Sequence, residues 1–296
     1  MKKILILIIS VFLLCSCSLN QSVNDEKKIK ITATIFPQYD FSRQIAGDLA
    51  SVSMLLPAGA ESHTFEPTPK DIVEIENSDI FIYTGGESDM WIKDILNDIS
   101  NTDLKIISLS DICTNNEEHS HTTDEHFWTS PKNVLKICEK IRDTLCEIDY
   151  ENKTIYESNF KLYESQLLEL DNAFKNAKTD AKRNILIFGD RFPFKHLTDE
   201  YSIEYLSAFP GCAEETEPDI KTIMNLINKV NEDVIPVVFY SDFSDHKIAD
   251  TICEKTNSKP LMLRSCHTAT EEELLNGVTY IDLMMANAQK IKEALN

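Results

Sequence analysis

The sequence predicts an α/β protein of two lobes, each a four-stranded, mainly parallel sheet with flanking helices, joined by one long interlobe helix. Three observations favour this architecture. Short apolar runs alternate with helical patterns on both sides of the chain's centre, which is typical of parallel sheets covered on both faces. Residues 132–188 contain no Gly or Pro, as expected of a helical segment between the lobes. The composition of the 296 residues, 42% apolar and 26% charged, excludes a disordered or collagen-like chain.

The expected strands are short apolar runs, four on each side of the central segment. In the first lobe they cover residues 29–35, 52–56, 80–83 and 104–109, with helices near 72–77 and 90–99. In the second lobe they cover residues 185–188, 203–209, 234–240 and 261–263, with helices near 219–231, 246–256 and 277–295. The predicted divisions are a signal peptide (1–16), a lipidated tether (17–27), an N-terminal lobe (28–130), a helical segment (131–182) and a C-terminal lobe (183–296).

An apolar stripe identifies the interlobe helix within the central segment. Its members recur at alternating steps of four and three residues, which places them on one helix face. They are Tyr156, Phe160, Tyr163, Leu167, Leu170, Phe174 and Ala177. About 28 residues that each rise ~1.5 Å span roughly 40 Å, enough to cross the molecule. A coiled-coil dimerisation helix is the weaker alternative, because the stripe is short and α/β segments flank it. A monomer is therefore expected.

The first residues indicate export and a lipid anchor. Lys2 and Lys3 precede residues 4–14, an apolar run that is too short to span a bilayer and is typical of a signal-peptide core. Its end resembles the lipobox of bacterial lipoproteins, in which a small residue precedes the lipidated cysteine. Cys17 fits this pattern better than Cys15, and an ordinary secretory signal is the alternative. The expected location is the extracytoplasmic face of the cell membrane.

Acidic residues greatly outnumber basic ones. The chain has 49 Asp and Glu against 29 Lys and Arg, which gives a formal net charge of −20. Most of such a surface repels nucleic acid, so DNA and RNA are not expected partners. The same field favours a cation, although net charge bears more directly on solubility than on function.

Six cysteines remain once Cys15 and Cys17 are assigned to the signal and anchor. They are Cys113, Cys138, Cys146, Cys212, Cys253 and Cys266. No CxxC spacing occurs among them, so thiolate zinc sites and thioredoxin-like chemistry lack their usual pattern. The sequence predicts structural or free thiols.

His63 lies in a constrained loop, residues 57–69, that follows an expected strand. Thr68 is a natural helix N-cap and Pro69 a natural first helical residue. The carboxyl edge of a parallel sheet is where α/β proteins usually bind ligands. His63 is thus well placed to bind a metal, while a loop histidine that is merely hydrogen-bonded is the alternative.

His126 lies directly before the central helical segment. Ser130 can cap that segment, with Pro131 as its first residue. Two carboxylates precede the histidine and two aromatic residues follow it, which are the polar partners and the water-excluding wall that a metal ligand needs. A surface loop that packs Trp128 onto a lobe is the alternative.

Together these two loops resemble the zinc and manganese substrate-binding lipoproteins of bacterial ABC transporters (ZnuA/TroA-like). The family's His-x-x-Glu-Pro-Thr-Pro and Asp-x-His-x-Trp-x-x-Pro segments match residues 63–69 and 124–131. The resemblance covers essentially the whole mature chain. It implies two α/β lobes joined by a long helix, with a metal bound between them by His63 and His126 from the first lobe.

The second lobe departs from the commonest family pattern. No histidine follows its first strand, where Asp190 is nearest in position and chemistry, although that carboxylate could instead pair with Arg191. After the last strand, where the family usually places an acidic residue, His267 is the natural donor. The resemblance therefore implies a metal site of His63, His126, Asp190 and His267. Cys266 is a competing donor, and we expect it to pair with Cys212 instead.

The remaining histidines are assigned other roles. His119 and His121 lie in a polar, acidic stretch that resembles a shortened form of the family's histidine-rich loop, with a simple solvated loop as an equal alternative. His196 and His246 are expected to be structural or exposed.

The function that the resemblance implies is capture of extracellular Zn²⁺ and its delivery to an ABC permease, without enzymatic activity. A Mn²⁺-specific member of the same family is one alternative. A secreted zinc metallohydrolase is another, with Glu61 or Glu66 as general base, although no HExxH motif occurs. An adhesin is a third possibility that no sequence feature supports.

Overall fold

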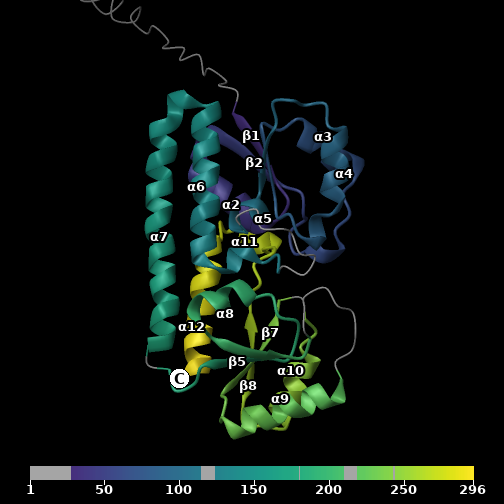
Figure 1. Cartoon of the computed structure of the whole chain (residues 1–296), viewed down its shortest axis with the longest axis vertical. Coiled ribbons are helices and arrows are strands. Elements are labelled where there is room, and N and C mark those ends of the chain that lie inside the picture. Colours follow the sequence, from purple (N-terminus) through teal and green to yellow (C-terminus); the bar gives the residue numbers. More distant parts are fainter. Residues whose placement is uncertain (1–27, 115–123, 180, 210–218, 243) are drawn as a thin grey trace, which may run out of the picture.

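The computed structural model describes residues 28–114, 124–179, 181–209, 219–242 and 244–296. These residues form two α/β lobes stacked along the long axis of the molecule, with a layer of long helices beside them (Figure 1). The predicted signal peptide and tether, including Cys17, lie outside the described residues, as do His119, His121 and Cys212.

The first lobe is a parallel sheet with the strand order β2-β1-β3-β4. Its strands are β1 (Ile29–Ala33), β2 (Ala50–Met54), β3 (Ile80–Tyr83) and β4 (Lys105–Ser108). The helices between and after them are α2 (Phe36–Ala46), α3 (Pro69–Glu76), α4 (Trp91–Asp98) and α5 (Leu109–Cys113). All four expected strands are confirmed: β3 has the expected bounds, β1 and β4 are shorter, and β2 begins and ends two residues earlier than expected.

The second lobe repeats the plan with the order β6-β5-β7-β8, again parallel throughout the described pairs. Its strands are β5 (Ile185–Phe188), β6 (Glu204–Ser207), β7 (Val237–Ser241) and β8 (Lys259–Leu263). Its helices are α8 (Lys195–Tyr201), α9 (Ile220–Glu232), α10 (Lys247–Glu254), α11 (Glu271–Leu275) and α12 (Tyr280–Leu295). The predicted α/β class and the four-stranded parallel sheets are therefore confirmed.

The central segment is a pair of helices rather than one continuous helix. α6 (Pro131–Ile148) ends at Asp149, a short 3-10 turn (Tyr150–Asn152) follows, and α7 (Lys153–Thr179) returns alongside α6 (Figure 1). The turn needs no Gly or Pro, because Asp149 Oδ2 accepts hydrogen bonds from the side chains of Asn152 (2.8 Å) and Tyr156 (2.7 Å). A sequence pattern based on Gly and Pro therefore could not predict this break between the two helices.

α7 is the long helix that the apolar stripe predicts, and all seven stripe residues are buried. It packs against α6, α2 and α12, and α12 in turn contacts strands of the second sheet. One apolar core therefore runs from the first lobe to the second along this helical layer. At ~1.5 Å per residue the 27 residues of α7 extend roughly 40 Å, which spans both lobes.

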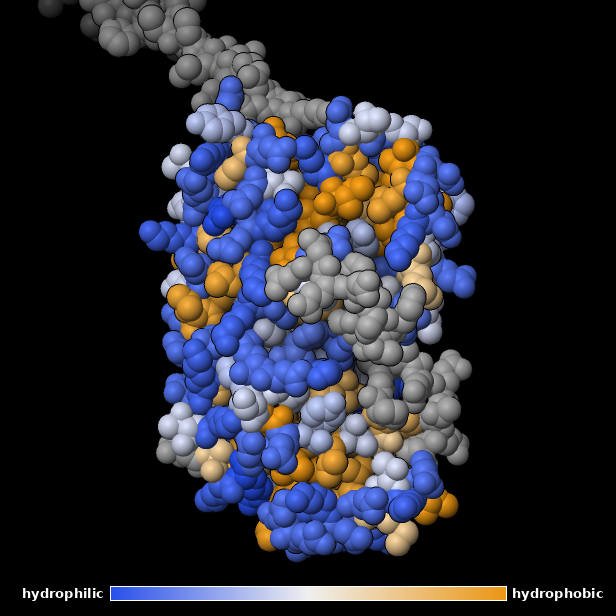
Figure 2. Space-filling view, in the orientation of Figure 1, coloured by the Kyte–Doolittle hydropathy of each residue, from blue (hydrophilic) through white to orange (hydrophobic). Residues whose placement is uncertain are grey.

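One face of the molecule carries both polar and apolar areas. Figure 2 shows hydrophilic residues over much of this face, with apolar side chains gathered in the upper part of the first lobe and within the second lobe. Within the described residues, no helix is long and apolar enough to cross a membrane.

Candidate metal centre

Two of the predicted histidines come from loops at the carboxyl end of the first sheet. His63 lies in a 3-10 turn (Ser62–Thr64) after β2, and His126 directly precedes another (Phe127–Thr129) that leads into α6. Both predicted helix starts are confirmed. The hydroxyl of Thr68 accepts a hydrogen bond from a backbone N–H of α3, and that of Ser130 accepts one from α6. These caps fix where each loop ends.

The third histidine, His267, follows β8 of the second lobe, yet its loop is attached to the first lobe. The backbone N–H of Phe36 donates to the carbonyl of His267 at 3.1 Å, and the indole N–H of Trp128 donates to the carbonyl of Ser265 at 2.8 Å. Cys266 between them has a left-handed backbone (φ 64°), which turns the chain sharply. The imidazole of His267 is thereby held beside the first lobe.

The three imidazoles lie together in the interior. One potential metal-binding atom from each of His63, His126 and His267 lies within 4.8 Å of the other two. The distances between ring centroids are 4.8 to 5.7 Å. His126 and His267 are buried, and His63 is partly buried. Three nitrogen donors at this spacing can surround one small cation.

A carboxylate lies behind each first-lobe imidazole. Nδ1 of His126 is 2.9 Å from Asp124 Oδ1, and Nδ1 of His63 is 3.1 Å from Glu125 Oε1. An ionised carboxylate only accepts hydrogen bonds, so these contacts place the imidazole proton on Nδ1 and assign the Nε2 lone pair to a metal. The sequence had suggested both carboxylates as partners of His126, whereas Glu125 contacts His63 instead.

The electrostatics keep these carboxylates ionised. Burial by itself raises the pKa of Glu125, but hydrogen bonds from His63 and Ser88 and the charge on the imidazoles lower it, to about 2. Burial opposes ionisation of Asp124 too, and the contacts with His126 and His196 still lower its pKa. Two ionised carboxylates thus contact His63 and His126 near neutral pH.

Trp128 closes one side of the group. Its ring centroid is 5.4 Å from that of His126 and 5.0 Å from that of His267, and the side chain is buried. The indole N–H is used by the bond to Ser265. This ring is the water-excluding wall expected from the sequence.

Comparison with known families decides which kind of protein carries this site. The profile of the family described as "ZnuA: Zinc-uptake complex component A periplasmic" matches residues 31–294, nearly the whole described chain. The protein belongs to the ZnuA family. The resemblance drawn from the two histidine loops is thereby confirmed.

Curated relatives include one protein named ZnuA and others named AdcA. The chain is 28% identical to the "High-affinity zinc uptake system protein ZnuA" of Bacillus subtilis over 310 residues, which cover 98% of this chain and 97% of that protein. It is 27% identical to the "Zinc-binding lipoprotein AdcA" of Streptococcus pneumoniae over 307 residues, 99% of this chain but only 61% of AdcA. The chain thus spans about three fifths of that relative.

Solved structures of ZnuA-like proteins share the fold. The "Metal-dependent Lipoprotein YcdH" of Bacillus subtilis matches with a TM-score of 0.80 at 27% identity, over 90% of this chain and 99% of that chain. The "Zn(II)-bound ZnuA-like domain" of Streptococcus pneumoniae AdcA matches with a TM-score of 0.77 at the same identity and coverage. The two-lobed architecture is that of the ZnuA family.

Asp190, the fourth ligand expected for this ZnuA-family chain, stands apart from the three histidines. It follows β5 and lines a cavity of about 220 Å³ between the lobes, together with His267 and Glu61. Its Oδ2 accepts hydrogen bonds from the backbone N–H (2.8 Å) and the hydroxyl (2.6 Å) of Ser241. The alternative partner, Arg191, takes no part in these bonds. Asp190 is therefore near the site without belonging to its group of donors.

Cys266 is a poor competitor for a metal. Its thiol is buried and lies 3.6 Å from the carbonyl oxygen of Arg264, and burial raises its pKa well above the usual range. Only a thiolate binds a metal strongly, and this environment disfavours one. Cys266 has no disulfide partner among the described residues, and Cys212, its expected partner, lies outside them.

The two other described histidines have the expected structural or exposed roles. His196 Nε2 is 2.8 Å from the carbonyl oxygen of Asp124, and its ring lies 4.8 Å from that of Phe127. His246 is exposed at the start of α10, with Nδ1 2.7 Å from Asp250 Oδ2. His196 thus joins the lobes, while His246 is remote from the metal centre.

Three polar residues of the centre were missed from the sequence. They are Ser88, Ser265 and Asp242, which contact the histidines directly or through one another. Ser265 carried a weak signal, since it lies two residues before His267 after a strand. Ser88 and Asp242 are distant in sequence from the residues that they serve, so no local pattern identified them.

The metal-free protein should lose stability on acidification below pH ~6.5. Burial, and then the positive charge of His126 and His63, hold the pKa of His267 well below its ordinary value. Between that lowered pKa and ~6.5 the unfolded chain binds a proton at His267 and the folded chain does not. The free energy of unfolding therefore decreases as the pH is lowered, by up to about 1.4 kcal/mol per pH unit. Urea unfolding at pH 7.5 and 5.5 measures this difference in the free energy of unfolding. The difference should be smaller in His267→Gln than in the wild type. An equal difference in the two proteins would assign the effect to other groups.

Proposed function

We propose that this protein captures Zn²⁺ between its two lobes, outside the cytoplasm, and delivers the ion to an ABC permease for import. The observation that carries the proposal is the convergence of His63, His126 and His267 from three separate loops. Membership of a family described as a zinc-uptake component supports it, as do the names of the zinc-binding relatives. A binding protein, not an enzyme, fits that description.

The donor chemistry favours zinc as the cargo. Three neutral imidazoles with one carboxylate make a nitrogen-rich set suited to tetrahedral Zn²⁺, whereas Mn²⁺ prefers oxygen-rich sites of higher coordination. We assign the fourth position to Asp190, because it lines the same cavity as His267 and is buried. Binding then requires its carboxylate to turn from Ser241 toward the metal.

The hydrolase alternative has little support in the geometry. Glu61 accepts a hydrogen bond from the backbone N–H of His63 at 3.3 Å and so caps the turn that carries this histidine. Glu66 is exposed. Glu61 lines the same cavity as His267, but its Oε1 is engaged by the backbone of the turn, which argues against its use as a general base on a metal-bound water.

Calorimetry with the metal-free protein tests the proposal. One Zn²⁺ per chain should bind at neutral pH, with release of protons, and an equal concentration of Mn²⁺ should fail to displace it. Elemental analysis of the loaded protein checks the stoichiometry. Displacement by Mn²⁺ would support the manganese alternative, and the absence of binding would contradict the function.

The lipid anchor and the monomeric state belong to the same proposal. Cys17→Ser should leave a folded, zinc-binding protein that no longer partitions with membranes, because the lipid is attached ahead of the first strand. Membrane fractionation of the wild type and variant measures this, with Cys253→Ser as a control that retains Cys17. Retention of Cys17→Ser in the membrane fraction would contradict the lipobox assignment.

A further inference from the structure

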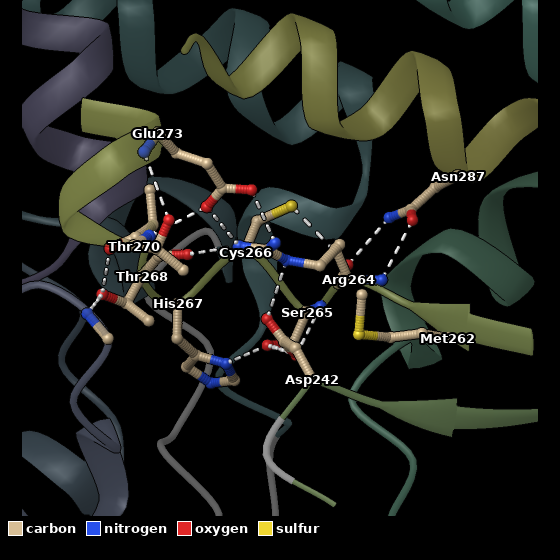
Figure 3. A network of polar contacts seen from close by, with 12 residues as sticks. Asp242, Met262, Arg264, Ser265, Cys266, His267, Thr268, Thr270, Glu273 and Asn287 are labelled. Atoms are coloured by element: carbon tan, nitrogen blue, oxygen red, sulfur yellow. Dashed lines mark hydrogen bonds and ion pairs between the residues drawn. The ribbon is translucent and has the colours of Figure 1, made fainter. Parts of the chain in front are cut away.

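Two polar side chains lie behind His267, first a serine and then a carboxylate, joined by hydrogen bonds (Figure 3). The hydroxyl oxygen of Ser265 is 2.7 Å from His267 Nδ1. Asp242 Oδ1 accepts hydrogen bonds from both the hydroxyl (2.8 Å) and the backbone N–H (3.0 Å) of the same serine. Asp242 follows β7 and Ser265 follows β8, and these strands are neighbours in the sheet.

Asp242 also forms an ion pair with an arginine on the side away from His267. Arg264 Nε forms an ion pair with Asp242 Oδ2 at 3.2 Å, while its two terminal nitrogens donate to the carboxylate of Glu273 at 2.8 and 3.1 Å. Glu273 also accepts the backbone N–H of Thr270 in the capping box of α11. The guanidinium thus binds one oxygen of Asp242, and the other oxygen faces Ser265.

The first lobe contains a similar arrangement behind His63, with the difference that the carboxylate of Glu125 also lies 3.1 Å from His63 Nδ1 itself. The hydroxyl oxygen of Ser88 is 2.8 Å from His63 Nδ1. That hydroxyl donates to Glu125 Oε1, and the backbone N–H of Ser88 donates to Glu125 Oε2 at 3.1 Å. Two of the three histidines therefore have a serine whose hydroxyl and backbone N–H both bind one carboxylate.

The hydrogen bonds of the two serines determine which ring nitrogen of each histidine carries the proton. A serine hydroxyl has one proton, and an ionised carboxylate has none to give. Since each hydroxyl donates its proton to a carboxylate, its oxygen can only accept from the imidazole, which must therefore carry its proton on Nδ1. Nε2 of each ring is then the nitrogen that would bind a metal.

We propose that Ser265 with Asp242, and Ser88 with Glu125, are positioning residues that fix the Nδ1–H tautomer of His267 and His63 before the metal arrives. The proposal rests on the proposed function of the three-histidine site and adds the residues that prepare it. Metal binding then needs no rearrangement of protons on these two rings. Loss of such a hydrogen-bonding partner typically lowers metal affinity by roughly 10–100-fold.

The tautomer can be observed directly in the metal-free wild type. Long-range ¹H–¹⁵N NMR spectra at neutral pH distinguish Nδ1–H from Nε2–H imidazole, and His63→Gln and His267→Gln assign the signals. Both rings should be in the Nδ1–H form. An Nε2–H tautomer at His267 would overturn the proposal and leave zinc binding by the protein untouched.

Serine variants test the link to affinity. Ser265→Ala and Ser88→Ala should each weaken zinc binding by about 10–100-fold in chelator competition and show a mixture of tautomers at the affected ring. Ser78→Ala is the matched control, because Ser78 is buried like Ser265 but bonds Thr32 and Glu74 at the opposite end of the first sheet. Wild-type affinity in both Ser265→Ala and Ser88→Ala would refute the positioning role, whereas a wild type that bound no zinc would refute the proposed function itself.

Discussion

Replacing His126 by alanine should cost more zinc affinity than the roughly 10–100-fold typical of losing an outer hydrogen-bonding partner. His126 is buried, its ring lies within 5.7 Å of the rings of His63, His267 and Trp128, and its Nδ1 is held by Asp124. Without it, only two imidazoles and the proposed Asp190 carboxylate remain at a buried position where a partly coordinated cation would be poorly solvated. His63→Ala and His267→Ala should have effects of similar size.

Competition against a chromophoric chelator on the metal-free protein measures each affinity. His246→Ala is the matched control, since His246 is exposed on α10 and its ring contacts Asp250 and Tyr240. Asp190→Ala should weaken binding less than any of the three histidine variants, because a water molecule can take a fourth position. Wild-type affinity in His267→Ala together with a large loss in Asp190→Ala would show that the second-lobe donor has been misassigned.

Trp128→Ala should destabilise the metal-free protein by about 3–5 kcal/mol, the usual cost of deleting a large buried aromatic side chain. The side chain is 1% exposed, and its indole N–H donates to the carbonyl of Ser265. Its own carbonyl accepts the hydroxyl proton of Tyr280 at the start of α12. The ring also packs on His126 and His267, so zinc affinity should fall with stability.

Chemical denaturation of the metal-free variants measures the loss. Trp128→Phe keeps an aromatic ring but leaves the buried carbonyl of Ser265 without this donor, so a smaller cost of about 1–3 kcal/mol is expected. Trp91→Ala is the control at the other tryptophan, which is partly exposed on α4 next to Phe65. It should leave zinc affinity near that of the wild type. Equal stability of Trp128→Ala and the wild type would contradict the packing role.

The two sheets and the long helix could be predicted because their signals are local. Four apolar runs on each side give the eight strands, and the stripe from Tyr156 to Ala177 gives the buried face of α7. The break between α6 and α7 could not be predicted, because its turn is stabilised by the side chains of Asp149 and Asn152 and contains neither Gly nor Pro. α2 was equally hidden, since its buried face includes the polar residues Gln38 and Asp40. Gln38 accepts a hydrogen bond from the backbone N–H of Ile35 at the start of the helix, and Asp40 accepts one from the distant backbone N–H of Tyr280.

By itself the sequence determined which side chains can bind a metal and which loops carry them. His63 and His126 stand in short motifs with their own helix caps, so local chemistry was enough to single them out. Only the tertiary structure decided which partners each ring has. It turned Glu125 toward His63, joined Ser265 to Asp242 across two strands, and directed Asp190 to Ser241. The physical reason is that such hydrogen bonds depend on the packing of loops from different strands, which no spacing along one segment encodes.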